Sequence, residues 1–415
     1  MGFVVTVAFA AQAGVGDGYE HAMQIAFTGY TNEVALTNFP ALIVLSEGTA
    51  GFSYGDMHST NADLRFAYGD GTELSYEIDQ WKPASQSFVW VKLPLLASNT
   101  VITCFWSQAG ITIPSYSLDG STWSEGFVSV HHFGTNAYPA LAPDYYNDDV
   151  WVLDSVANNG GGDHGYWGYT YGNGPGGYMD LTDWMPGKIG QCLAFNTDGG
   201  ELGAGTEYIL LEKKDGYQTF ANGITMSLWV KIAAYDAGGW TPFMDLHDIA
   251  SGGNNNIWWG ATGSPWSSEV DFYNGTGDTL SYFYDNGAYA IGQWAYVTYT
   301  VTKDAPDNCV GNTYMNGEPS AAFPGINMPS EVVRDECWFA SDGWGEWLYG
   351  SMDELQVSAV VRSPEWVWAS YRNQNNPATF AAYTPAEVPE PGAAAAAVVA
   401  IGCSLFAVWR RGREK

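Results

Sequence analysis

The sequence predicts an all-β protein with two β domains followed by a single C-terminal transmembrane helix. Fifty of its 415 residues are glycine, well above the usual ~7%. Aromatic residues make up 15% of the chain and charged residues 14%, a balance that allows a large core and is unlike that of disordered chains. Short runs that alternate apolar and polar residues, separated by Gly, Asn, Asp or Pro, favour strands over helices.

Residues 1–13 predict a signal peptide. They form an apolar run ending in Ala11-Gln12-Ala13, the small-x-small pattern of a cleavage site. The run lacks a basic n-region, so we expect the sequence to start inside a longer signal peptide. The alternative is a buried first strand of the next domain.

Residues 14–118 predict a β-sandwich. Alternating runs such as FPALIVLS, LSYEIDQW and SFVWVKLP recur between turn residues, which indicates six to eight short strands. The strongest hairpin signal is Gly69-Asp70-Gly71, because an Asp-Gly pair suits a tight turn between two strands.

This first domain resembles the DUF2341 family. The resemblance rests on LTNFPALIVL at 36–45, ADLRFAYGDGTELSYEIDQW at 62–81 and VWVKLPLLAS at 89–98. The family occurs in exported, adhesin-like or carbohydrate-associated proteins and has no firmly assigned chemistry. The resemblance therefore implies a cellular context and no catalytic residues.

Residues 119–383 resemble the LamG-like, concanavalin A-like jelly roll. The matching pieces include ITMSLWVKI at 224–232, QWAYVTYTV at 293–301 and GSMDELQVSAVVRSPEWVWASYRNQ at 350–374. Independently of the family, Asn316-Gly317 is typical of a type I′ hairpin. The segment from Ser363 to Asn373 predicts a helix, with Ser363 as its cap and proline in the first turn.

The C-terminal segment predicts a membrane span. Residues 392–409 are 18 uncharged and mostly apolar residues, long enough at 1.5 Å per residue to nearly cross a ~30 Å hydrocarbon core. A linker at 384–391 precedes this segment and a basic tail at 410–415 follows it. The arginines of the tail place that end in the cytoplasm.

This arrangement closely resembles the PEP-CTERM sorting signal of Gram-negative bacteria. The matching residues outside the apolar span are Val388, Pro389, Glu390, Pro391, Arg410 and Arg411. The resemblance implies cleavage by an exosortase-type membrane protease, after which the protein is released or anchored again. A plain membrane anchor is the alternative, and both place the two β domains outside the inner membrane.

The cysteines agree weakly with export. Cys403 lies in the predicted span, and the other four are Cys104, Cys192, Cys309 and Cys337. Their spacings fit no zinc motif. We favour a disulfide between Cys309 and Cys337 because both lie in one domain, with free buried thiols as the alternative.

The net charge of −30 excludes a generic nucleic-acid-binding protein, which needs clustered Lys and Arg. No complete catalytic motif is present. Gly51-Phe52-Ser53-Tyr54-Gly55 matches a nucleophile elbow but sits among strands, and a glycine pattern at 172–177 contains a proline where a dinucleotide site opens a helix.

One carboxylate pair resembles part of a glucanase motif. Glu269-Val270-Asp271-Phe272 is similar to the E-x-D-x-x-E strand of jelly-roll β-glucanases, but the final glutamate is missing. Retaining hydrolysis needs two suitably placed carboxyl groups. We therefore predict that the protein is not an enzyme.

Calcium is the cofactor that the sequence favours. Many LamG-like jelly rolls hold this ion, which takes oxygen ligands from Asp, Glu, Asn and backbone carbonyls. Asp154 and Asp353 match positions where acidic residues recur in that family. The alternative is that Asp353 accepts hydrogen bonds from loop amides and Asp154 only makes a turn.

Aromatic residues in Gly-rich segments predict a glycan-binding surface, because flat rings suit the apolar faces of sugars. The candidates are Tyr166, Trp167, Tyr169, Tyr171, Trp258 and Trp259. The alternative for each is core or turn packing. His131 and His132 are adjacent and would face opposite sides of a strand, so we expect them to be ordinary core and surface histidines.

Together these features predict an exported cell-envelope or extracellular-matrix protein that binds polysaccharide or surface glycans through its jelly roll. A glycoside hydrolase-like enzyme and a purely structural adhesin are the alternatives.

Overall fold

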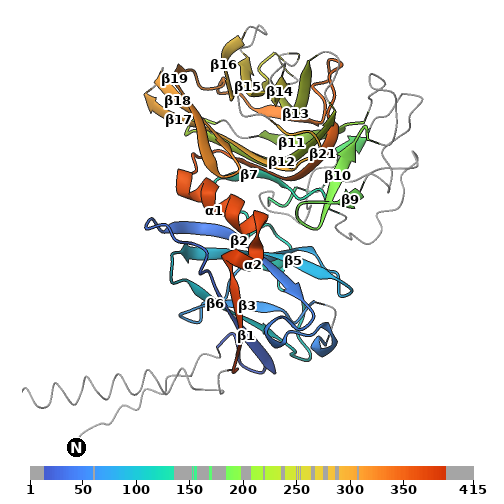
Figure 1. Cartoon of the computed structure of the whole chain (residues 1–415), viewed down its shortest axis with the longest axis vertical. Coiled ribbons are helices and arrows are strands. Elements are labelled where there is room, and N and C mark those ends of the chain that lie inside the picture. The colour runs from blue at the N-terminus through green and yellow to red at the C-terminus, as the bar shows by residue number, and fades with distance from the viewer. Residues whose placement is uncertain are drawn as a thin grey trace, which may run out of the picture.

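The computed structural model (Figure 1) describes most of the chain between residues 14 and 388. The described residues are 14–58, 61–134, 152, 154–156, 168–170, 184–197, 207–217, 220–234, 239–248, 250, 252, 254–262, 267–273, 279–285, 289–305 and 308–388. The predicted signal peptide, residues 389–391 of the sorting motif, the span and the basic tail lie outside them. Within the described part, no helix is long and apolar enough to cross a membrane.

The first domain is a β-sandwich, as predicted. Its four-stranded sheet has the order β22 (Ala382–Ala386), β1 (His21–Ala26), β6 (Val101–Trp106), β3 (Arg65–Tyr68). Its three-stranded sheet has the order β2 (Leu36–Ser46), β5 (Gln86–Leu96), β4 (Tyr76–Gln80). Three short 3-10 helices accompany them: η1 (Thr49–Gly51), η2 (Tyr54–Asp56) and η3 (Ser115–Ser117).

The predicted turn at Gly69-Asp70-Gly71 forms, although β3 and β4 on either side of it belong to different sheets. Gly71 has a φ of 87°, and the Thr72 N–H donates to Asp70 Oδ1 at 2.9 Å. The motif at 51–55 makes no nucleophile elbow. Instead, the Ser53 hydroxyl caps η2 by accepting a hydrogen bond from the Gly55 N–H at 3.1 Å.

The C-terminal part of the described chain completes the first domain. Strand β22 pairs antiparallel with β1, so that Ala382 lies opposite Ala26 and Ala386 opposite Ala22. The predicted boundary at residue 383 is therefore wrong, and part of the predicted linker at 384–391 is a strand. The sequence did not indicate this pairing because the two strands lie at opposite ends of the chain.

The second domain is a sandwich of two large sheets (Figure 1). The eight-stranded sheet contains β19 (Glu318–Ile326), β18 (Asn308–Met315), β17 (Ala295–Ala305), β12 (Ile224–Ala234), β21 (Tyr349–Ser358), β10 (Gln191–Phe195) and β9 (Trp184–Pro186) in that order, with β7 (Phe127–His131) also paired to β21. The seven-stranded sheet contains β16 (Thr279–Asp285), β15 (Ser267–Tyr273), β14 (Ile257–Thr262), β13 (Trp240–His247), β20 (Arg334–Phe339), β11 (Ile209–Tyr217) and β8 (Gly168–Thr170) in that order. The predicted hairpin at Asn316-Gly317 joins β18 to β19, and both residues have the positive φ that a type I′ turn requires.

Helix α1 (Pro364–Asn375) lies between the two domains (Figure 1). Its start is as predicted, because the Ser363 hydroxyl accepts a hydrogen bond from the Trp366 N–H at 3.3 Å. Trp366 belongs to the core of the first domain, while Trp229 of the second domain donates its indole N–H to Gln374 at 2.7 Å. The short helix α2 (Pro377–Phe380) then leads the chain back to β22.

The two domains share a buried interface along β21. Every residue of this strand is buried, because one face packs in the core of the jelly roll and the other is covered by the first domain and α1. The core of the first domain accordingly includes Val130 of β7 and Ile189, which comes from the segment before β10.

The cysteine pairing that we favoured is wrong. Among the described residues, Cys104, Cys192, Cys309 and Cys337 are all buried and form no disulfide. Cys309 is in β18 and Cys337 in β20, so the two belong to different sheets of the sandwich. Membership of one domain was therefore too weak a criterion for pairing them.

Candidate functional site

A cleft of about 470 Å³ opens on the outer face of the seven-stranded sheet. Strands β13, β14 and β15 form its floor, and a loop after β20 forms one side. Its lining residues are Trp240, Asp245, Asn254, Asn256, Trp258, Glu269, Asp271, Tyr273, Asp342, Trp344 and Glu346. This set is rich in carboxylates and aromatic rings.

The alternation of β15 places its polar residues in the cleft. Val270 and Phe272 are fully buried in the jelly-roll core. Since successive side chains on a strand point to opposite faces, Glu269, Asp271 and Tyr273 face outward together. The partial glucanase motif thus lies in the cleft.

The same alternation separates the two predicted tryptophans of β14. Trp258 lines the cleft, whereas Trp259 is fully buried and packs in the core. The assignment of Trp259 as a glycan-binding candidate is therefore wrong, because its ring has no face open to a ligand. Trp258 remains a candidate, although it is only 5% exposed.

Two exposed tryptophans flank the buried floor. Trp240 is 48% exposed and Trp344 is 73% exposed, which is unusual for rings of this size. The loop that carries Trp344 is held by Asp342, whose Oδ1 accepts hydrogen bonds from the backbone N–H groups of Trp344 at 2.8 Å and Glu346 at 3.2 Å. The ring is therefore presented to solvent on an ordered turn.

Asp271 has a perturbed acidity. Burial, followed by the charge of Glu269, raises the pKa of the Asp271 carboxyl to about 7. The Tyr273 hydroxyl donates to Asp271 at 3.1 Å, and the Thr262 hydroxyl donates to Glu269 at 2.8 Å. The two carboxyl groups thus differ in environment, and one of them can carry a proton near neutral pH.

Asp245 is the deepest carboxylate of the cleft. It is fully buried, accepts hydrogen bonds from the Asn256 amide at 3.1 Å and lies 3.0 Å from His247 Nε2. Burial alone would lower the pKa of His247, but the hydrogen bond to Asp245 and the Asp245 charge outweigh it and raise that pKa. Our sequence reasoning missed this pair, although Asp245 and His247 alternate with apolar residues along β13.

The remaining aromatic candidates cannot be assigned to the cleft. Tyr166, Trp167 and Tyr171 lie outside the described residues. The backbone of Tyr169 is in β8 and pairs with Leu210 at the edge of the same seven-stranded sheet.

The two predicted metal ligands lie away from the cleft and accept hydrogen bonds. Asp154 Oδ1 accepts from the backbone N–H of Val130 at 2.9 Å and of Val156 at 3.0 Å. Asp353, on β21, accepts from the backbone N–H groups of Lys188 and Ile189. Neither belongs to the one cluster of three or more potential metal ligands in the described part of the chain, and calcium binding by either stays a prediction.

Residues 203–368 match the family model of the concanavalin A-like lectin/glucanases superfamily. This match covers most strands of the two sheets, including β13, β14 and β15 at the floor of the cleft, and agrees with the predicted jelly roll. No curated protein matches the chain.

Several solved structures show a distant likeness to this chain. The binding domain of botulinum neurotoxin serotype G is 11% identical with a TM-score of 0.39, over 60% of this chain and 51% of that one. The aligned part thus spans about half the length of the toxin domain. Domain 4 of AbnA, a GH43 extracellular arabinanase from Geobacillus stearothermophilus solved with arabinotriose, is 19% identical with a TM-score of 0.38, over 59% of this chain and 98% of that one. A pentraxin from Limulus polyphemus is 12% identical with a TM-score of 0.33, over 43% of this chain and 80% of that one.

Proposed function

We propose that the protein binds a neutral polysaccharide in the cleft of its jelly roll. The observation that carries this proposal is the pairing of two exposed tryptophans, Trp240 and Trp344, with a floor of carboxylates. Aromatic rings stack on the apolar faces of sugars, and carboxylates accept hydrogen bonds from sugar hydroxyls. The match to a lectin and glucanase superfamily is consistent with this use of the fold, although a fold alone does not set function.

The charge of the cleft restricts the ligand. Five of its lining residues are Asp or Glu, and none of the described lining residues is Lys or Arg. An acidic polysaccharide would bring like charges together at short range, which is unfavourable. We therefore expect neutral sugars to bind and uronic acid polymers to be excluded.

We further propose that binding takes place outside the inner membrane, at the cell surface or in the extracellular matrix. This rests on the sequence of the two ends: an apolar run with a cleavage pattern at 1–13, and a Pro-Glu-Pro motif, apolar span and arginines at 389–413. Under this proposal an exosortase-type protease processes the C-terminal end. Calcium at Asp154 or Asp353 would support the fold rather than contact the sugar, because neither residue lines the cleft.

The test is a glycan array followed by calorimetry with the neutral polysaccharide that binds best. Trp344→Ala and Trp240→Ala should each weaken binding about 2- to 12-fold, since stacking on one ring is worth ~0.5–1.5 kcal/mol beyond area burial. Trp294→Ala is the matched control, because this ring lies beside Lys231 on the other sheet. Equal affinity of all three variants, or binding of no glycan at all, would refute the proposal, and the second result would favour a structural adhesin.

A glycoside hydrolase is the second candidate, and Asp271 favours it. A carboxyl with a pKa of about 7 is suited to donate a proton to a leaving group, and Glu269 on the same face could act as nucleophile or base. Retaining hydrolysis requires two such groups about 5–5.5 Å apart. Release of reducing ends from the bound polysaccharide, abolished in Glu269→Gln with binding retained, would establish the enzyme; intact polysaccharide after prolonged incubation would exclude it.

A further inference from the structure

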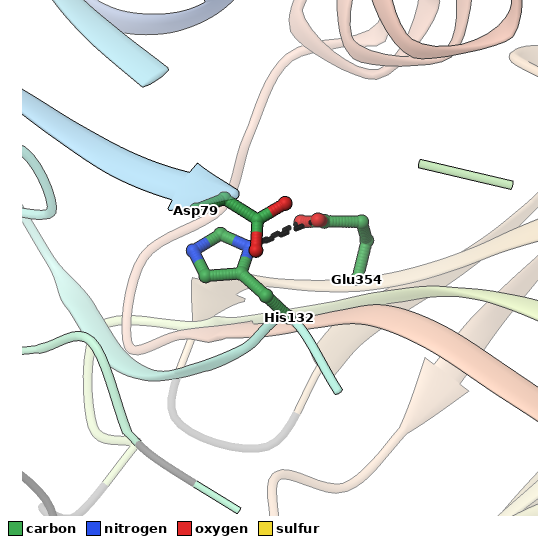
Figure 2. A group of neighbouring side chains, drawn as sticks. All are labelled: Asp79, His132 and Glu354. Carbon is green, nitrogen blue, oxygen red and sulfur yellow. Dashed lines mark hydrogen bonds and ion pairs between the residues drawn. The ribbon is translucent and has the colours of Figure 1, made fainter. Parts of the chain in front are cut away.

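Three ionisable side chains from distant parts of the chain meet between the two domains (Figure 2). Asp79 comes from β4 of the first domain, His132 follows β7, and Glu354 comes from β21. They are 6%, 3% and 0% exposed. One potential ligand atom from each lies within 4.8 Å of the others, a spacing that a single bound ion can bridge.

Two β-bulges direct the carboxylates to this point. In β4, Ile78 and Gln80 pair with the consecutive residues Val89 and Phe88, so Asp79 is the extra residue. In β21, the register against β12 also shifts near Glu354, which has a φ of 53°. A bulge re-aims a side chain at the cost of local ladder hydrogen bonds.

The second bulge places two consecutive acids on one face. Met352 and Leu355 both belong to the jelly-roll core, so Asp353 and Glu354 both face the first domain. With regular alternation Glu354 would point into the apolar core, because successive side chains of a strand face opposite sides. The bulge instead supplies the carboxylate that contacts His132.

The buried charge at this interface is unbalanced. Glu354 is 2.9 Å from His132 Nδ1, and Glu77 is 3.7 Å from His132 Nε2, so one imidazole faces three carboxylates when Asp79 is included. His132 Nε2 has no hydrogen-bond partner among the described residues. Buried carboxylates are costly unless they are paired or coordinate a metal, and a divalent cation would supply the missing charge.

The surroundings of His132 match those of a metal-bound histidine. Glu77 lies on the ring nitrogen away from Glu354 and is itself held by the Trp123 indole N–H and by the Ser155 hydroxyl at 2.6 Å. Trp90 stacks on the imidazole with a centroid distance of 5.8 Å and an interplanar angle of 23°. In metal sites, a carboxylate commonly orients the second nitrogen of a ligating histidine in this way.

We propose that Asp79, His132 and Glu354 bind one divalent transition metal ion, with zinc as the best fit, and that the ion joins the two domains. An imidazole combined with carboxylates suits zinc, whereas calcium prefers an all-oxygen set. The ion takes the place of the proton between His132 Nδ1 and Glu354, so binding releases that proton to solvent. Because the three ligands are buried, the role is structural.

The experiment measures metal on the full-length protein after chelator treatment and dialysis. We expect one equivalent of zinc to rebind in preference to calcium or magnesium. Zinc binding should raise the melting temperature. Substitution with cobalt should produce visible absorption bands typical of a coordinated ion. Failure to rebind one equivalent of any divalent transition metal would overturn the proposal.

Variants locate the site. His132→Gln and Asp79→Asn should each remove the cobalt bands and lower zinc affinity at least 100-fold, whereas Glu77→Gln should lower it about 10- to 100-fold. The matched control is His247→Gln, which alters another buried pair of a histidine and a carboxylate, on the seven-stranded sheet, and should bind metal like the wild type. Near-UV circular dichroism verifies that each variant is folded. If His132→Gln does not fold, the metal affinity of the milder variant Glu77→Gln tests the site. Unchanged affinity in Asp79→Asn and Glu77→Gln, or loss of metal in His247→Gln, would contradict the assignment.

Discussion

The two outer faces of the jelly roll carry similar residues in opposite settings. On the seven-stranded sheet, Asp245 lies at the floor of a cleft with exposed tryptophans on its rim, and it contacts His247. On the eight-stranded sheet, Glu354 and His132 form a comparable pair, but both are buried, and Trp90 of the first domain stacks on His132. The same chemistry is therefore open to a ligand on one face and enclosed on the other.

This difference shows that the ability of each face to bind a ligand depends more on whether another domain covers it than on which residue types it carries. The open face keeps aromatic surface exposed at Trp240 and Trp344, which a monomeric domain rarely does without use. The covered face uses its aromatic residues as packing between domains. The predictions below test this division, from the largest expected effect to the smallest.

Replacing a tryptophan by alanine should strongly lower the free energy of unfolding on the covered face and leave it nearly unchanged on the open face. Trp366 is buried, and its ring centroid lies 5.1 Å from that of Phe39 and 4.1 Å from the guanidinium carbon of Arg362. Trp366→Ala should lower the free energy of unfolding by ~3–5 kcal/mol, measured by urea denaturation. Trp344→Ala should change it by less than ~0.5 kcal/mol, and similar losses in both variants would contradict the division.

A single asparagine of α1 should make a smaller contribution to the free energy of unfolding. Asn373 accepts a hydrogen bond from the Leu42 N–H at 2.6 Å and donates to the Leu42 carbonyl at 3.0 Å, which satisfies the free edge of β2. Asn373→Ala leaves both backbone groups buried and unpaired, so we expect a loss of ~1–3 kcal/mol in urea denaturation. Asn375→Ala, an exposed position on the same helix, is the control, and an equal effect there would show that α1 does not cap β2 through Asn373.

The open face should have a distinct pH dependence of stability. Because the folded-state pKa of Asp271 is raised to about 7, the folded protein holds this proton more tightly than the unfolded chain does. The resulting stability is present below the unfolded pKa near 4 and is lost as the pH rises to about 7. Asp271→Asn should thus match the wild type at pH 4 and melt roughly 2–4 °C higher at pH 8.

Thermal melts from pH 4 to pH 8 measure this effect. Asp70→Asn is a control of opposite sign, because a hydrogen bond from Thr72 lowers the pKa of Asp70, and its removal should slightly destabilise the protein at neutral pH. If Asp271→Asn melts with the wild type at every pH, Asp271 does not hold a proton near neutrality.

Local features of the fold were predictable from the sequence because they depend on neighbouring residues. The strand pattern, the Asn316-Gly317 hairpin and the Ser363 cap each need only a few consecutive side chains, and all three formed as expected. The glucanase-like strand was also predictable from the sequence, since the alternation of side chains along a strand places Glu269 and Asp271 on one face. The rim of the cleft was harder to predict from the sequence, because the exposure of Trp240 and Trp344 depends on which loops surround them.

The sequence by itself determined that this chain builds two β-sandwiches and supplies acids and aromatic rings at alternating positions along their strands. Only the tertiary structure decided which face each set occupies. The tertiary structure turned Trp259 to the core and Trp258 to the cleft. Pairing of β22 with β1 and the meeting of Asp79, His132 and Glu354 both join segments far apart in the chain. Such contacts depend on sheet register, bulges and domain docking, which the pattern of neighbouring residues does not specify.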